Sequence, residues 1–311
     1  MGKNEIYKWM KRSLKNKVSI TGKMLVIFLI SGTLSQAGSV PGTSLAGGEP
    51  TPSAENSVAI GNGAKATVKE AFAIGTGSKS NSLGSFAFGY FAEIGQNSDF
   101  AYSIGWYSRI GNGAKHSYAI GHYASIQDNA ENAFAFGWDA KVKTGASSSY
   151  AIGDHAETAS QKAYALGKEA KVNEESDYGY AIGHRSEVER GSKYSYAIGY
   201  EARVGAGLEN VYAIGREAKA MAKNSLVFGS NSTVHKDAEN TVALGSDITE
   251  AKERNSVYLG NGSTHGKKDE TTIGKGSYAN TTINGHMFKG YAGINAYGIV
   301  TVGKKDQERR I

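Results

Sequence analysis

A short apolar run closed by glycine recurs along most of this chain. It reads Val58-Ala59-Ile60-Gly61 near the start and Tyr196-Ala197-Ile198-Gly199 further on. The glycines that close it are Gly61, Gly75, Gly89, Gly105, Gly121, Gly137, Gly153, Gly167, Gly183, Gly199, Gly215, Gly229, Gly245 and Gly260, with a last copy at Gly274. Their spacing in the sequence is nearly constant. A fixed short period of this kind predicts a solenoid, in which each repeat forms one coil.

Positions counted from the closing glycine show what each coil contains. Position −1 is Ile, Leu or Phe and position −3 is aromatic or aliphatic, whereas −2 is mostly Ala and −4 is small. After the glycine, +3 is Ala or Ser and +5 is commonly Ile or Val. Alternation on both sides of a glycine predicts two short strands joined by a tight turn. We therefore predict an all-β parallel solenoid with coils of about 14–16 residues, in which the closing glycines form the turns.

The strands that end at the glycine lack a charged face. Positions −3 and −1 are bulky and apolar, and positions −4 and −2 are small and uncharged. A sheet with one face in water normally alternates apolar with polar residues. A narrow roll covers only one of its faces, so we expect the other to pack against a second copy of the chain. The sequence alone leaves open which face is inside.

The N-terminal region is basic and differs from the repeats. Seven of the 35 Lys and Arg residues, but only one of the 29 acidic residues, lie in 1–37, so the rest of the chain has equal numbers of each sign. A basic stretch followed by Met24–Ile30 and then Ser35-Gln36-Ala37 predicts a cleaved secretory signal over 1–37. Residues 38–55, rich in Gly, Ser, Thr and Pro, are expected to form a linker. The balanced remainder does not favour nucleic acid as a partner.

The repeat resembles a known family. Asn56-Ser57-Val58-Ala59-Ile60-Gly61, followed by Ala64 and Ala66, is similar to the YadA-type head repeat of trimeric autotransporter adhesins. Residues 298–303 and 308–311 resemble the start of that family's neck. The resemblance therefore divides the chain into head repeats over 56–280 and a truncated neck-like segment over 281–311. One departure is the Tyr and Phe at −3, where mostly Val or Thr is expected.

The resemblance implies a fold, an assembly and a role. The fold is a left-handed parallel β-roll, assembled as a homotrimer. The role is attachment of a bacterial cell surface, at the outer membrane, to a host protein. That partner is an extracellular matrix protein or an immunoglobulin-like adhesion receptor such as a CEACAM. The alternative is a structural spacer or surface-layer protein without a receptor site of its own.

The turns after four consecutive closing glycines are rich in aromatic residues. Turn positions +1 and +2 hold Tyr90, Phe91, Trp106, Tyr107, His122, Tyr123 and Trp138, whereas later turns are mostly charged. Because successive coils are about 4.8 Å apart, these rings should form a ladder on one edge. Two interpretations remain open. The rings either cover the edge of the roll or fill a groove of the assembly, or they bind a protein partner, since Trp and Tyr dominate interface hot spots. For the second interpretation the candidate partner-binding residues are Tyr90, Phe91, Trp106, Tyr107, Tyr123 and Trp138.

No catalytic pattern stands out. The seven histidines are scattered without metal-ligand spacing, there is no cysteine, and the glycine-rich segments lack the lysine of a phosphate-binding loop. Acyltransferases with a left-handed β-helix have a hexapeptide period, which does not fit these coils. We therefore expect a protein that is not an enzyme and has no cofactor, metal or small-molecule substrate.

Overall fold

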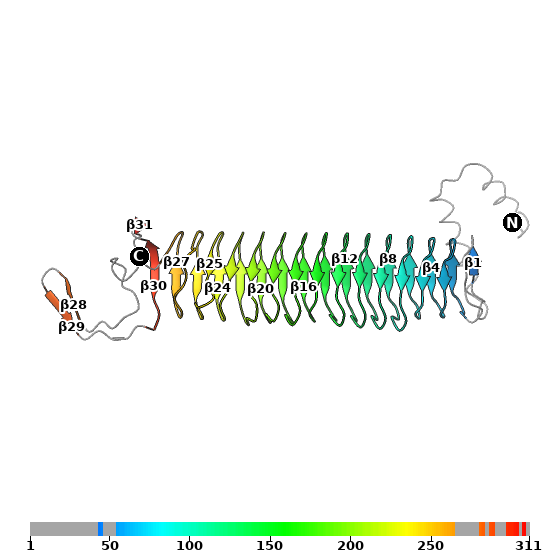
Figure 1. The fold of residues 1–311 in the computed structure, drawn as a ribbon, viewed down its shortest axis with the longest axis horizontal. Coiled ribbons are helices and arrows are strands. Elements are labelled where there is room, and N and C mark those ends of the chain that lie inside the picture. The colour runs from blue at the N-terminus through cyan, green and yellow to red at the C-terminus, as the bar shows by residue number, and fades with distance from the viewer. Residues whose placement is uncertain are drawn as a thin grey trace, which may run out of the picture.

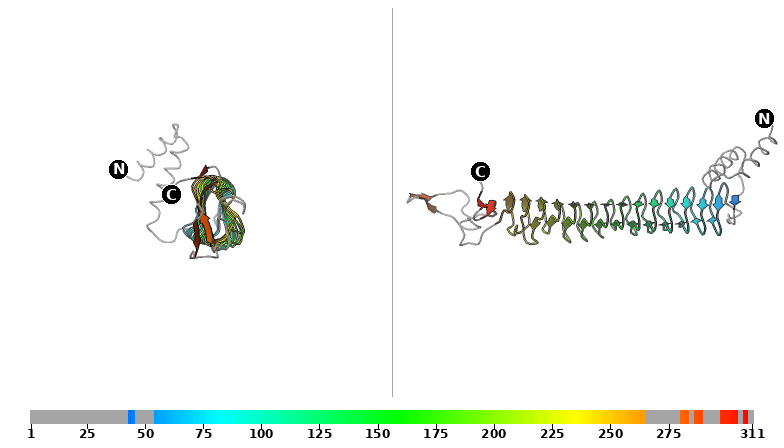
Figure 2. Two further views of the ribbon diagram at one scale, coloured as in Figure 1. Left: turned by 90° about the vertical axis from the view of Figure 1, so that its left-hand side faces the viewer. Right: turned by 90° about the horizontal axis from the view of Figure 1, so that it is seen from above.

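The protein is a straight β-solenoid whose coils stack along one axis (Figure 1). The computed structural model describes residues 43–45, 54–264, 280–283, 286–289, 297–304 and 307–308. Each coil contributes a three-residue strand to one sheet and, in most coils, a two-residue strand to another. We call these the first sheet, with 17 strands, and the second sheet, with 12 strands. Seen from the end, the coils superimpose in a narrow roll (Figure 2).

The strands begin and end at the same positions in each repeat. In the first sheet the repeats supply β2 (Val58–Ile60), β4 (Phe72–Ile74), β6 (Phe86–Phe88), β8 (Tyr102–Ile104), β10 (Tyr118–Ile120), β12 (Phe134–Phe136), β14 (Tyr150–Ile152), β16 (Tyr164–Leu166), β18 (Tyr180–Ile182), β20 (Tyr196–Ile198), β22 (Tyr212–Ile214), β24 (Leu226–Phe228), β26 (Val242–Leu244) and β27 (Val257–Leu259). The second sheet contains β3 (Lys65–Ala66), β5 (Lys79–Ser80), β7 (Glu93–Ile94), β9 (Arg109–Ile110), β11 (Ser125–Ile126), β13 (Lys141–Val142), β15 (Glu157–Thr158), β17 (Lys171–Val172), β19 (Glu187–Val188), β21 (Arg203–Val204), β23 (Lys219–Ala220) and β25 (Thr233–Val234).

Neighbouring coils pair in parallel and in register. Val58 pairs with Phe72 across one of the shorter coils, and Tyr102 pairs with Tyr118 across one of the longer coils. In both cases the two paired residues stand at the same position relative to their own closing glycines. The extra residues of the longer coils therefore leave the strand register unchanged. The predicted all-β parallel solenoid, with one coil for each repeat, is confirmed.

Small side chains fill the interior of the roll. The alanines at −2, such as Ala119 and Ala181, are fully buried, and so are the +5 residues Ile126 and Val188. Since successive strand residues point to opposite faces, the bulky −3 and −1 side chains lie on the outer face of the first sheet. The face of the first sheet with small side chains is therefore inside the roll, and its bulky apolar face is outside, which the sequence alone left open.

Buried serines link the coils inside the roll. The Ser117 hydroxyl donates to the Ala130 carbonyl (2.9 Å) and accepts from the Ala133 N–H (3.0 Å). Ser98 does the same with the Gly111 carbonyl (2.6 Å) and the Ala114 N–H (3.0 Å). A buried hydroxyl normally requires such partners, so these serines add specific bonds to the alanine packing.

The closing glycines form the predicted turns for two physical reasons. Gly121 has a φ of +135°, which L residues rarely adopt. A Cβ on Gly121 would also collide with the Gly137 carbonyl of the next coil, because the glycine backbones stack on one another. The final copy, Gly274, lies outside the described residues.

Further strands pair with both ends of the stacked coils. β1 (Thr43–Leu45), within the expected linker, pairs in parallel with β2. β30 (Val300–Lys304), within the expected neck-like segment, pairs in parallel with β27 and antiparallel with β31 (Gln307–Glu308). β28 (Asn280–Ile283) and β29 (His286–Lys289) form an antiparallel pair.

The expected signal segment, 1–37, lies outside the described residues. Within the described part of the chain, the structure has no helix with the length and apolar character needed to span a membrane.

Candidate partner-binding surface

The aromatic turn residues come together on one edge of the solenoid. We call this surface the aromatic edge; it comprises Tyr90, Phe91, Trp106, Tyr107, His122, Tyr123 and Trp138. The six candidate residues are 39–53% exposed, with Trp138 the most exposed. His122 is more buried, and its Nε2 has no hydrogen-bond partner among the described residues. The ladder that the repeat spacing predicts is therefore present.

The rings form two columns. In the +2 column, the Phe91 and Tyr107 ring centroids are 5.4 Å apart and those of Tyr107 and Tyr123 are 5.6 Å apart, with interplanar angles of 5° and 17°. In the +1 column, the His122 ring stacks between Trp106 (4.7 Å) and Trp138 (6.5 Å). Stacking along the solenoid axis covers most ring faces with other rings.

Part of the aromatic edge also packs against the roll. A Cβ on Gly77 would lie 2.8 Å from the Phe91 ring, which shows that this ring covers the glycine of the preceding coil. Phe91, Tyr107 and Tyr123 all have φ between +51° and +59°, in the left-handed region. Aromatic residues rarely adopt this conformation, and here the tight turn imposes it on them. The turn backbone therefore fixes the direction in which these rings leave the chain. Partial desolvation raises the pKa of the Tyr107 phenol, and Tyr90 and Tyr123 raise it further.

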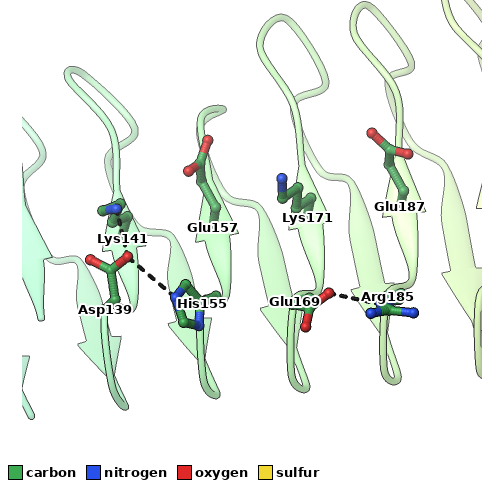
Figure 3. A pocket seen from close by; sticks show the side chains of 8 residues that line it. All are labelled: Asp139, Lys141, His155, Glu157, Glu169, Lys171, Arg185 and Glu187. Atoms are coloured by element: carbon green, nitrogen blue, oxygen red, sulfur yellow. Dashed lines mark hydrogen bonds and ion pairs between the residues drawn. The ribbon is translucent and has the colours of Figure 1, made fainter.

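Beyond Trp138 the same edge becomes charged. Figure 3 shows two rows that line a surface pocket: Asp139, His155, Glu169 and Arg185 at +2, and Lys141, Glu157, Lys171 and Glu187 at +4. Arg185 Nε donates to Glu169 Oε2 (2.8 Å), and its Nη1 lies 3.6 Å from Glu201 Oε1. The bond to Arg185 lowers the pKa of the Glu169 carboxyl. Charges of opposite sign alternate along the +4 row, and several are paired within the chain, as for Glu157 with Lys143 (3.5 Å) and Glu187 with Arg203 (3.6 Å).

The outer face of the first sheet is a second candidate surface, and it is apolar. Its −1 side chains include Phe136 (53% exposed) and Phe228 (56% exposed). At −3, an uninterrupted column of aromatic rings extends from Phe72 to Tyr212, with neighbouring centroids such as those of Phe134 and Tyr150 5.3 Å apart. Within this chain no described element covers the face.

Smaller aromatic clusters lie on the opposite edge, and the sequence analysis missed them. Phe100 stacks on His116 (5.6 Å), and Tyr178 stacks on Tyr194 (5.0 Å). Lys162 Nζ donates to the Tyr178 hydroxyl (2.7 Å). All occupy position −5, where the residue type varies from coil to coil. Aromatic residues at the same offset in consecutive coils were the signal that could have identified them.

The ionisable groups show no metal-binding arrangement. Among the described residues, no group of three or more His, Cys, Asp or Glu side chains is placed to hold a metal ion. The pocket of Figure 3 contains one histidine, His155, which lies 3.7 Å from Asp139 and 2.5 Å from Asp154.

Comparison with known proteins finds a family repeat at the start of this solenoid. A model of the YadA head domain repeat matches the chain twice, over residues 53–78 and 69–92. Residues 53–92 therefore contain YadA-like head repeats, as the Asn56–Gly61 motif predicts. Solved structures with similarity include the collagen-binding domain of the Yersinia adhesin YadA, which is 23% identical, with 56% of this chain and 81% of that chain covered and a TM-score of 0.34. No curated protein matches the chain.

Proposed function

We propose that this protein is the head of a bacterial surface adhesin and that its aromatic edge binds a host protein. The observation that carries the proposal is the group of half-exposed tryptophan and tyrosine rings gathered at consecutive turns of one edge. Trp and Tyr supply large contact areas at low entropic cost and are enriched in binding hot spots. The tyrosine hydroxyl and indole N–H groups can also donate to carbonyl oxygens of a protein partner. The proposed partner is a matrix protein or an immunoglobulin-like receptor such as a CEACAM.

The proposed adhesin acts as a homotrimer of left-handed rolls. The support is the outer face of the first sheet, where two columns of apolar side chains run along the solenoid. Monomeric proteins rarely expose a continuous apolar surface of this extent. The second sheet instead carries charged +4 side chains toward solvent, so the first sheet is the face that a second copy would cover.

The proposed site of action is the bacterial surface. The support is the basic and apolar pattern of residues 1–37, which is typical of a secretory signal. Attachment to the outer membrane is the arrangement that the YadA-like head domain suggests.

A structural spacer is the second candidate function. The packing of Phe91 over Gly77 favours it, because rings that stabilise the turns need no receptor. The two functions differ in what the tryptophans do, and this difference can be measured.

The test replaces the two most exposed rings. Trp106→Ala with Trp138→Ala should weaken attachment to host cells, and to the matrix protein or receptor that binds the parent, roughly thirtyfold or more. That factor corresponds to about 2 kcal/mol, the usual effect of losing a central hot-spot aromatic. Binding is measured by surface plasmon resonance against collagen, fibronectin, laminin and adhesion receptors. Thermal unfolding of the variant is recorded in parallel.

Tyr200→Ala is the matched control, since Tyr200 occupies the same +1 position and is 41% exposed but lies in the charged stretch. It should leave binding unchanged. If the double variant binds like the parent, the aromatic edge is not the docking site. If it unfolds at a much lower temperature while the remaining folded protein still binds, the rings are packing elements.

A further inference from the structure

The two edges of the first sheet carry complementary charges in the same coils. In the coils closed by Gly167, Gly183 and Gly199, position +2 on one edge holds Glu169, Arg185 and Glu201. Positions −6 and −5 on the opposite edge of these three coils hold Lys162, Asp177 and Lys193. We call the first the closing-turn edge and the second the −5 edge. The signs run negative, positive, negative along one edge and positive, negative, positive along the other.

The three charges of the −5 edge form no ion pair with a described residue. Lys162 Nζ donates to the Tyr178 hydroxyl (2.7 Å), and both Lys162 and Lys193 are exposed. On the closing-turn edge Arg185 binds Glu169 of its own chain (Figure 3), but its side chain remains 52% exposed. Both edges therefore present charge that another molecule can pair.

Threefold assembly through the first sheet brings these two edges together. This step rests on the homotrimer proposed above. Three sheets that face one axis form the sides of a triangular prism, and each corner joins the closing-turn edge of one copy to the −5 edge of the next. The solenoid is straight (Figure 1), so copies can pack along their whole length with parallel axes. Rotation about a parallel axis does not move a copy along it, so the same coils lie at the same height in every copy.

We propose that neighbouring copies meet edge to edge, each coil against the same coil, and form ion pairs between copies. The pairs are Lys162 with Glu169, Asp177 with Arg185, and Lys193 with Glu201. A shift of one coil would instead place Asp177 beside Glu169 and Lys193 beside Arg185, which are like charges in both cases. A staggered contact of that kind does not close into a ring and leads to an open filament. The alternating signs therefore favour the closed trimer over the filament.

The coils of the aromatic edge match in the same way. Phe100, on the −5 edge, belongs to the coil that carries Trp106 and Tyr107, and its side chain is 48% exposed. The same contact places Phe100 of the next copy beside the aromatic edge. The surface proposed above to bind a host protein then includes residues from two copies.

Carbodiimide coupling tests the pair of Lys193 with Glu201, because it joins an amine directly to a carboxylate in contact with it. Within one chain the three residues of β20 hold these side chains about 10 Å or more apart on opposite edges. Trypsin cleaves after Arg190 and Arg203, so one chain supplies residues 194–203 only once. We expect the coupled full chain to yield peptide 191–203, linked through Lys193, joined to a second copy of residues 194–203, linked through Glu201. Only two chains can supply this product, and Glu201→Gln should abolish it.

A charge reversal tests the same pair without chemical coupling. Lys193→Glu removes one ion pair at each corner and puts two carboxylates there. The concentration at which the trimer dissociates, measured by light scattering on dilution, should rise roughly tenfold. Lys223→Glu is the matched control. Lys223 occupies the same −6 position between acidic −6 residues, but +2 in its coil is the uncharged Asn231. This variant should dissociate like the parent.

The outcomes separate the edge contact from the proposed trimer. A parent of three chains that gives no product with residues 194–203 present twice would overturn the edge contact and leave the trimer standing. Equal dissociation of the Lys193→Glu and Lys223→Glu variants would likewise overturn the ion pairs between copies. A parent that scatters as a single chain would contradict the trimer and the edge contact together.

Discussion

Glycine at the end of each first-sheet strand is the residue on which the coil most depends. The sequence predicts this role, because glycine at a fixed offset in every repeat indicates a backbone position that cannot accommodate a side chain. The collision partner could not be predicted. It is the carbonyl of the equivalent glycine one coil later, and that contact exists only once the register of the stack is known.

Two glycine substitutions separate conformational strain from steric collision. Gly121→Ala places a methyl group against the Gly137 carbonyl at a φ of +135°, whereas Gly145→Ala, at a φ of +72°, meets no atom within 4 Å. Gly145→Ala should therefore cost only about 1–2 kcal/mol for its left-handed backbone. Gly121→Ala should cost clearly more, since neighbouring backbones must also move. Urea unfolding of both variants measures the difference, and equal losses would show that the stacked glycines tolerate a side chain.

The aromatic edge could be predicted only in part. Its position follows from the turn offset in each coil, and the structure places all six candidate residues there. The stacking of the rings and the covering of Gly77 by Phe91 could not be read from the sequence, because they depend on how each side chain leans along the axis. The binding experiment with Trp106→Ala and Trp138→Ala distinguishes a docking surface from rings that only pack against the roll.

The strands show which properties of a coil are local and which depend on its neighbours. Period-two alternation correctly predicts a strand on each side of the turn. It does not say which face is inside, because both faces of the first-sheet strands are uncharged. The answer follows from width: so short a coil encloses little space, so alanine and serine fill most −2 positions between the sheets, and Tyr258 is buried at −2 only in the last described repeat.

Charged turn residues connect the strands of neighbouring coils, and this contribution should depend on pH. Arg185 contacts Glu169 of the preceding coil and Glu201 of the following one. Since the pKa of Glu169 is lowered in the folded state, the stabilisation is present above the ordinary carboxyl pKa and is lost as pH falls through the lowered value. Arg185→Gln should therefore lower the unfolding temperature slightly at pH 7 and leave it unchanged near pH 3.

Thermal unfolding of Arg185→Gln and the parent across this pH range provides the measurement. Exposed ion pairs contribute little, so the difference at pH 7 should be small and should shrink further in high salt. Lys219→Gln, which removes a positive charge where no ion pair with a described residue is present, should behave like the parent at every pH. A difference between Arg185→Gln and the parent that persists at pH 3 would assign the effect to packing of the arginine stem instead.

The two long faces of the molecule differ in chemistry, and this difference governs how it can assemble. The second sheet displays +4 charges that are paired along the stack, as for Lys79 with Glu93 (3.9 Å) and Arg109 with Glu93 (4.0 Å). The first sheet displays aromatic and aliphatic side chains throughout. At the ends, β1 and β30 pair with the terminal coils, so part of each open sheet edge is already covered. The apolar long face is therefore where copies of the chain are expected to meet.

Charge placed on that face should separate the copies without unfolding the roll. At micromolar concentration the parent is expected to have the mass of three chains by light scattering. Phe136→Glu with Phe228→Glu should give a single chain, because burying an unpaired carboxylate costs several kcal/mol and each trimer would contain six. The variant should keep its β-sheet circular dichroism, since neither side chain is part of the interior. Ser125→Glu with Thr233→Glu puts the same charge on the outer face of the second sheet and should leave the mass at three chains. A parent that scatters as a single chain, or a Phe136/Phe228 variant that remains a trimer, would contradict assembly through the first sheet.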